Sequence, residues 1–326
     1  MASSVAFSKD VLKIDAAAET ERLCAWIQRM VQGELKKRGA VVALSGGIDS
    51  SVVGSLCVRA LGADRVFGLL MPERDSSAET RRLGAELVAH FGIRYAEEDL
   101  TDILAAFGCY RRRDEAIASV VPDYQPGWKH KIVLPSVTAS DMYRVYSVVV
   151  QRPDGTEVRA RLTPDAYLQI VAATNFKQRS RKAMEYYHSD RLNYVVTGTP
   201  NLLEYDQGFF VKLGDGAADI KPIAHLYKSQ VYQLAEYLGV PEGIRRRPPT
   251  TDTYSLSQSQ EEFYFSLPYD QMDLCLYAKN NGVPAAAVGE ALGLTADQVE
   301  RVFRDIDSKR KVAHYLHLPP QVVAGS

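Results

Sequence analysis

The sequence has few cysteines, no long apolar run and almost no net charge. Its four cysteines, at positions 24, 57, 109 and 275, are widely spaced and form no C-x-x-C pair, which argues against disulfides and zinc and favours reduced thiols in a core. No stretch approaches the roughly 18 uninterrupted apolar residues of a membrane span, and residues 1–13 lack the apolar core of a signal peptide. We therefore expect a cytoplasmic protein that does not contact a membrane.

The formal net charge is only −1, so no overall basic field favours nucleic acid. The basic runs 111–113 and 245–247 could each meet phosphate, although such runs are more often solvated surface. The six histidines show no spacing typical of metal ligands. A hydrophobic content of 46% in 326 residues is enough to bury a large core. These properties predict a globular protein with one large α/β domain, or one domain with an appendage, and no nucleic-acid partner.

The chain also lacks the two common phosphate-binding motifs, Gly-Lys-Ser/Thr and G-x-G-x-x-G. Instead, the apolar segment 41–44 leads into a Ser/Gly turn that opens a helix. Gly46 and Gly47 permit close approach of an anion, the helix start offers free N–H groups, and Asp49 is placed to hold a magnesium ion on the phosphates. The candidate phosphate contacts are Leu44, Ser45, Gly46, Gly47, Asp49, Ser50 and Ser51.

Apolar periodicity predicts helices over 18–39, 52–61 and 77–91, which alternate with strands over 41–44, 65–71 and 93–97. This alternation is typical of a parallel sheet with helices on both faces. Ligands of such sheets bind at the carboxyl ends of the strands. The segment 41–51 would lie at that edge.

The alternation stops in residues 108–163, where we predict a β-hairpin with Asp154-Gly155 in its turn. A helix over 164–188, a strand over 194–197 and a helix over 229–238 follow, and the tail is expected to form helices over 270–279, 285–292 and 296–307. We thus divide one catalytic domain into a first half of the core (1–107), an insertion with a hairpin (108–163), and a second half with a helical C-terminal part (164–326).

Several blocks occur in one order and carry a family resemblance: 44–51, 71–77, 175–181, 198–204, 208–219, 226–231 and 249–252. Ser-Gly-Gly-x-Asp-Ser after a strand resembles the pyrophosphate loop of the N-type ATP pyrophosphatases. The later blocks, such as Gly208-Phe209-Phe210 and Leu226-Tyr227-Lys228, are similar to those of the NAD synthetases, the amide-forming branch of that group.

The resemblance implies a Rossmann-like ATP pyrophosphatase fold and an ATP-dependent ligase with ATP and Mg²⁺ as cofactors. Its members adenylate the carboxylate of deamido-NAD, release pyrophosphate and let ammonia displace AMP to give NAD. A homodimer is also implied. Only about 40 residues precede the core, so the ammonia is expected to be free or to come from a separate glutaminase.

The resemblance also assigns residues to roles, and these assignments are as follows. Asp49 and Glu204 correspond to metal carboxylates, and Asp49, Lys228 and Thr250 to the catalytic set. Further contacts to ATP are Met71, Arg74, Arg179 and Thr199, and contacts to the acid substrate are Phe209, Lys212, Asp215, Asp219 and Lys309. Arg179 and Arg181 are two apart on a helix and point in different directions, so one is expected to face the nucleotide, and we favour Arg179.

The sequence departs from the family pattern on the acid side. Ser308 replaces a histidine of the family's His-Lys-Arg run, and residues 108–163 are longer than in a minimal member. The hairpin there could be a dimerisation arm, a lid, part of a remodelled acid pocket or a structural addition. Two alternatives therefore stay open: the same adenylation chemistry on a different carboxylic acid, and a non-catalytic nucleotide-binding protein.

Overall fold

A four-stranded parallel sheet forms the centre of the computed structural model, which describes residues 7–134, 145–249, 253–256, 258–259, 264–265 and 267–323. Its strand order is β3-β2-β1-β7, and these strands are β1 (Ala40–Ala43), β2 (Val66–Leu70), β3 (Arg94–Glu97) and β7 (Val195–Thr197). All three pairings are parallel, so the carboxyl ends of β1 and β7 are neighbours. The predicted parallel α/β sheet is confirmed.

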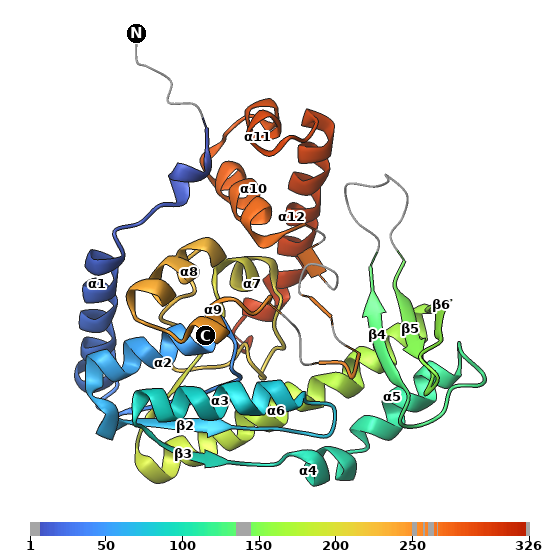
Figure 1. Ribbon diagram of the computed structural model, residues 1–326, viewed down its shortest axis with the longest axis horizontal. Coiled ribbons are helices and arrows are strands. Elements are labelled where there is room, and N and C mark those ends of the chain that lie inside the picture. The colour runs from blue at the N-terminus through green and yellow to red at the C-terminus, as the bar shows by residue number, and fades with distance from the viewer. Residues whose placement is uncertain are drawn as a thin grey trace.

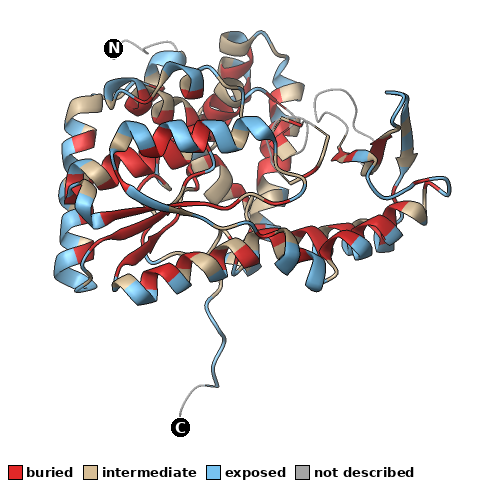
Figure 2. Cartoon of the chain, turned by 60° about the horizontal axis from the view of Figure 1, so that its bottom comes forward, coloured by how far each residue is buried: buried red, intermediate tan, exposed pale blue. Residues whose placement is uncertain are grey.

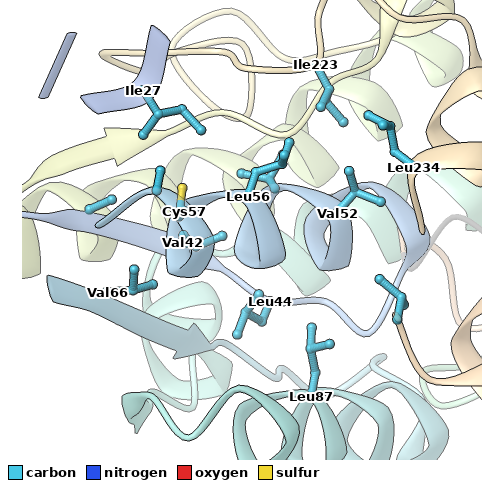
Figure 3. Close-up of a cluster of buried hydrophobic side chains, with 14 of the residues drawn as sticks. Ile27, Val42, Leu44, Val52, Leu56, Cys57, Val66, Leu87, Ile223 and Leu234 are labelled. Atoms are coloured by element: carbon cyan, nitrogen blue, oxygen red, sulfur yellow. The ribbon is translucent and has the colours of Figure 1, made fainter. Parts of the chain in front are cut away.

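One face of this sheet is covered by α2 (Ile48–Leu61), α3 (Ala78–Phe91) and, further out, α1 (Ala16–Gln28), its π-helical extension η2 (Arg29–Glu34) and α8 (Lys228–Tyr237). Val42 of β1 and Val66 of β2 belong to this core together with Leu56 of α2 and Leu234 of α8 (Figure 3). Successive strand residues face opposite sides of a sheet. Val41 and Phe67 therefore belong to a different core on the other face.

The other face packs against α4 (Thr101–Ala106), the start of α5 (Cys109–Ala118) and the second half of α6 (Pro164–Leu192). Thr163 caps α6 and Pro164 occupies its first turn, which explains where this helix begins. Helices thus cover both faces of the sheet, as predicted (Figure 1).

A second, antiparallel sheet lies against the first half of α6, at the end of the molecule away from the parallel sheet (Figure 2). Its order is β4 (Lys129–Val133), β5 (Ser147–Gln151) and β6 (Glu157–Arg161). The predicted hairpin is the β5–β6 pair, and Gly155 in its turn has φ +85°. Neither β4 nor α5 was predicted.

The C-terminal part is helical, as expected, and it has its own core. It contains α10 (Tyr269–Asn281), α11 (Ala285–Leu292) and α12 (Ala296–His317), which packs on the short α7 (Leu202–Gln207). The last helix continues well past the predicted end at residue 307. Short helices η1 (Lys9–Leu12), η3 (Ala63–Arg65) and α9 (Glu242–Arg245) complete the fold. Within the described residues, no helix is long and apolar enough to cross a membrane.

Candidate active site

The Ser/Gly turn connects β1 to α2 at the carboxyl edge of the parallel sheet. Gly46 has φ +69°, and a Cβ at this position would lie 2.7 Å from the Leu83 Cβ of α3. Both the backbone conformation and the close packing require glycine. The turn is therefore a tightly packed loop that points the N-terminus of α2 toward the space beyond the strands.

Hydroxyl groups hold this loop from within. Ser50 and Ser51 both donate to the Gly47 carbonyl oxygen, at 3.1 and 2.8 Å, and Ser51 is completely buried. Ser45 is exposed, and its Oγ accepts from the Gly47 N–H at 3.3 Å. Ser45 is thus available to a ligand, whereas Ser51 supports the loop.

Asp49, in the first turn of α2, is held by two residues from other elements. Its Oδ1 accepts from Asn201 Nδ2 at 3.0 Å, and its Oδ2 pairs with the ammonium of Lys228. Asn201 also caps α7 and accepts from the Glu204 N–H at 3.3 Å, while the Glu204 carboxylate accepts from the Asn201 N–H at 3.2 Å. This reciprocal capping box fixes both carboxylates next to Lys228.

Lys228 is 2% exposed and is the first residue of α8. Burial alone would lower the pKa of its ammonium, but the charges of Asp49 and Glu204 outweigh burial and raise that pKa. Lys228 is therefore a fixed positive charge at neutral pH. A buried ammonium of this kind suits an anionic ligand at the adjoining loop.

A cavity of about 440 Å³ opens over this group, at the carboxyl ends of β1, β2 and β7. Many residues predicted from the sequence line it. They are Leu44, Ser45, Gly47, Asp49, Ser50, Met71, Thr199, Glu204, Phe209, Asp215 and Lys228. Burial raises the pKa of Asp215, whose carboxylate accepts from the Val211 N–H at 2.7 Å.

Other predicted residues lie behind the cavity wall. Gly46 and Ser51 form the back of the loop. Arg74 stacks over the Tyr110 ring, with its Cζ 3.7 Å from the ring centroid, and its guanidinium lies 3.6 Å from an Asp75 oxygen. The described lining residues do not include Arg74.

Three residues predicted to hold the acid substrate instead brace the walls. Lys212 donates to the Tyr315 carbonyl oxygen at 2.9 Å, and Asp219 accepts from the Val196 N–H at 2.7 Å. Lys309 pairs with Asp305 and donates to the carbonyl oxygen of Tyr264, a residue that lines the cavity. Thr250 lies outside the described residues.

The two arginines of the 175–181 block point in different directions, as expected from their spacing. Arg181 lines the cavity, and its Nε lies 3.5 Å from the Met71 carbonyl oxygen. Arg179 is exposed and donates to the Lys212 carbonyl oxygen at 3.3 Å. Arg181, rather than Arg179, therefore lies at the cavity.

Sequence reasoning missed an aromatic wall of the cavity, made by Tyr146, Tyr167, Tyr254 and Tyr264. Tyr146 and Tyr167 stack with ring centroids 4.3 Å apart, and Tyr264 stacks on Phe209 at 4.7 Å. Tyr146 directly precedes β5 and Tyr167 lies in the first turn of α6. Both tyrosines lie next to the predicted hairpin in the sequence, and this position could have suggested that they lie close together.

A buried ionic cluster next to the cavity was missed as well. Lys177 of α6 is 1% exposed and donates to Glu73 at 2.9 Å, to Asp75 at 2.7 Å and to the Thr253 carbonyl oxygen at 2.9 Å. Arg113 of α5 also pairs with Asp75, at 2.6 Å. These contacts fix the loop after β2, which carries Met71.

A magnesium site can be tested against the donors present. Among the described residues, no group of three or more His, Cys, Asp or Glu side chains is arranged to hold a metal. Asp49 and Glu204 both line the cavity beside Lys228. Mg²⁺ commonly binds one or two carboxylates together with substrate phosphates and water. These two carboxylates fit that pattern.

The parallel sheet, its Gly-rich loop and the buried lysine define a nucleotide-binding α/β protein of the ATP pyrophosphatase type. More specifically, the chain belongs to the NAD synthase family, whose model matches residues 19–121 and 144–319. The unmatched residues 122–143 fall inside the 108–163 segment that the sequence marked as an insertion.

Relatives extend this similarity over nearly the whole chain. The NH(3)-dependent NAD(+) synthetase of Rhizobium meliloti is 60% identical over 317 residues, which cover 97% of this chain and 95% of the relative. That of Thermotoga maritima is 36% identical over 257 residues, with 78% and 85% covered. Among solved structures, the NH3-dependent NAD synthetase from Campylobacter jejuni has a TM-score of 0.62 at 23% identity and covers 95% of this chain and 100% of its own. It shares the fold.

Proposed function

We propose that this protein converts deamido-NAD, ATP and ammonia into NAD, AMP and pyrophosphate. A carboxylate oxygen of deamido-NAD attacks the α-phosphorus of ATP, and the bond to the β-phosphate breaks. Ammonia then attacks the activated carbonyl carbon and AMP leaves with the oxygen that bridged it. The observation that carries this proposal is the joining of the Ser/Gly loop, Asp49 and buried Lys228 at one cavity. The relatives' names and the family match support the identity of the acid.

Lys228 and the loop would bind the β- and γ-phosphates. The loop offers the N–H groups at the start of α2 and the Ser45 hydroxyl, and Lys228 supplies a fixed positive charge where pyrophosphate leaves. Because these donors are already in place, they need little reorganisation during the reaction. Thr199, in the loop after β7, and Met71, in the loop after β2, would flank the adenosine.

Asp49 and Glu204 would hold Mg²⁺ when it is bound, and the ion would neutralise charge on the phosphates. Both carboxylates also act on the charge of Lys228. Each carboxylate oxygen has more than one lone pair, so Asp49 can accept from Asn201 and Lys228 and still offer acceptor sites. Thr250 is proposed as a further phosphate contact.

The acid substrate would occupy the part of the cavity bounded by Phe209 and Asp215. We assign to Arg181 the nucleotide-facing role predicted for Arg179, because Arg181 lines the cavity. Lys212, Asp219 and Lys309 would act by holding the walls that carry these residues.

Free ammonia, or ammonia from a separate glutaminase, is the proposed nitrogen source, in keeping with the ammonia-dependent relatives. A cytoplasmic location is also proposed, because all four cysteines are free thiols and three of them are buried. We further propose a homodimer. A partner subunit would cover exposed apolar side chains such as Leu213, Val312 and Tyr315, which are 71%, 71% and 65% exposed.

The direct test is a coupled pyrophosphate assay with ATP, Mg²⁺, ammonium and either deamido-NAD or nicotinate mononucleotide. We expect NAD to form with deamido-NAD, with a kcat/KM at least about a hundredfold above that for the mononucleotide. The reverse preference would support the alternative, a different carboxylic acid. Absence of turnover with every acid would support the non-catalytic alternative.

A further inference from the structure

A fully buried carboxylate, Asp273 of α10, lies at the N-terminus of α8. One of its oxygens accepts from the Lys228 N–H at 3.2 Å. The other accepts from the Ser229 N–H at 2.7 Å and from the Ser229 hydroxyl at 2.6 Å. Asp273 therefore binds the backbone of the first two residues of α8.

This end of α8 concentrates positive charge. The helix dipole places partial positive charge on its free N–H groups, and the buried ammonium of Lys228 belongs to the same turn. Tyr227, which precedes the helix, offers no side-chain cap. Asp273 supplies the missing acceptors and a compensating negative charge from a different helix.

The Lys228 backbone is thereby fixed while its side chain extends to Asp49 on α2. A chain of contacts runs from the C-terminal helices through Asp273 and Lys228 to the loop at the end of β1. We propose that Asp273 is a positioning residue for the reaction, because it holds the first turn of α8 so that Lys228 reaches Asp49 and the phosphates. This inference rests on the phosphate-binding role proposed above for Lys228.

Burial raises the pKa of Asp273 to about 6. Its charged form is therefore kept in the core against a desolvation cost, with Lys228 as the nearby cation. An apolar residue would avoid that cost. The retained charge agrees with a role in organising the lysine.

A double-mutant cycle tests the inference, with calorimetric binding of ATP in the presence of Mg²⁺ as the readout, so that no acid substrate is needed. Lys228→Gln is expected to raise the Kd by about tenfold or more, and Asp273→Asn by about fivefold. If Asp273 acts through Lys228, the double variant will bind within about twofold of Lys228→Gln alone. Asp270→Asn is the matched control, since Asp270 lies on the same helix and pairs with Lys9 in an exposed contact.

An unfolding measurement and a replacement variant separate a loss of ATP binding from a loss of folding. Denaturant unfolding of each variant reports global damage, and Ser229→Ala, which removes only the hydroxyl bond, replaces Asp273→Asn if that variant does not fold. The inference is overturned if the Kd of the double variant rises by the product of the increases in the two single variants. It is also overturned if Asp273→Asn has the same Kd as Asp270→Asn. Normal ATP binding without NAD formation would instead count against the proposed function and leave this result intact.

Discussion

Asp49 and Lys228 come from two different helices and meet under the cavity. We expect Asp49→Asn to lower kcat for pyrophosphate release at least about a hundredfold, because the loop loses its negative charge for Mg²⁺ and Lys228 loses its anchor. Asn can still accept from Asn201, so the fold should be kept. The exposed Asp64 provides a control as Asp64→Asn. More than half of the normal rate in the Asp49 variant would refute its assigned role.

The raised pKa of Asp273 predicts that the stability of the protein falls as pH rises. Its pKa is raised from 3.8 to about 6 in the folded protein, so the folded state binds the proton more tightly than the unfolded chain. Stability should therefore fall as pH rises from about 4 to about 6, by roughly 3 kcal/mol from this group. Urea unfolding of the parent and of Asp273→Asn across that range measures the difference between the two. Parallel curves would contradict the raised pKa.

The positions of Asp49 and Glu204 at the cavity were predictable because their motifs follow the ends of β1 and β7, and that of Lys228 because its block resembles the family's. Arg181 was harder to identify because the choice between it and Arg179 depends on how α6 rotates against the sheet. Only the packing of its buried face settles that rotation. Lys177 was hidden for a similar reason, since its carboxylate partners are about 100 residues away in the sequence.

At the scale of elements, the loop between β1 and α2 depends on Gly46. Gly46→Ala should lower the free energy of unfolding by about 2–4 kcal/mol, because it combines a positive φ with a Cβ 2.7 Å from that of Leu83. Gly92→Ala is the matched control: Gly92 also has a positive φ, +62°, but has no atom within 4 Å of its would-be Cβ. It should cost only about 1 kcal/mol. Equal losses in denaturant unfolding would show that packing against α3 is unimportant.

Most elements of the parallel core were predictable because apolar periodicity and turn residues agree there. Helix α5 was missed because its buried face includes Arg113 and Asp114, so no apolar stripe marks it. Strand β4 carries a buried His130 among lysines and was missed for the same reason. In α5, charged pairs replace apolar contacts, and in β4 the buried His130 bonds to Ser255. Such polar partners are recognisable only when both residues are in place.

At the scale of the whole molecule, α6 joins the two sheets. Ile170 packs with the antiparallel sheet, whereas Phe176 and Met184 pack with the parallel one. Because Tyr146, which directly precedes β5, lines the cavity, the antiparallel sheet also contributes to it. Of the roles that the sequence left open for the hairpin, a part in the acid pocket is the one we favour.

The proposed homodimer gives a prediction at this scale. Sedimentation equilibrium at micromolar concentration should give twice the chain mass of 36.2 kDa. Val312→Glu, on the exposed face of α12, should shift the protein toward monomer because it places a charge in an apolar contact. The exposed Glu300→Gln, on the same helix, is a control that should not. If the parent protein sediments as a monomer, the proposed homodimer is wrong.

The central claim is that the carboxylate of the acid takes up AMP before ammonia reacts. Deamido-NAD with ¹⁸O in its carboxylate, turned over with ATP and ammonium, tests this by mass spectrometry of the products. The account predicts one ¹⁸O in the phosphate of AMP and none in pyrophosphate. Unlabelled AMP, or label in inorganic phosphate with ADP as the second product, would contradict it.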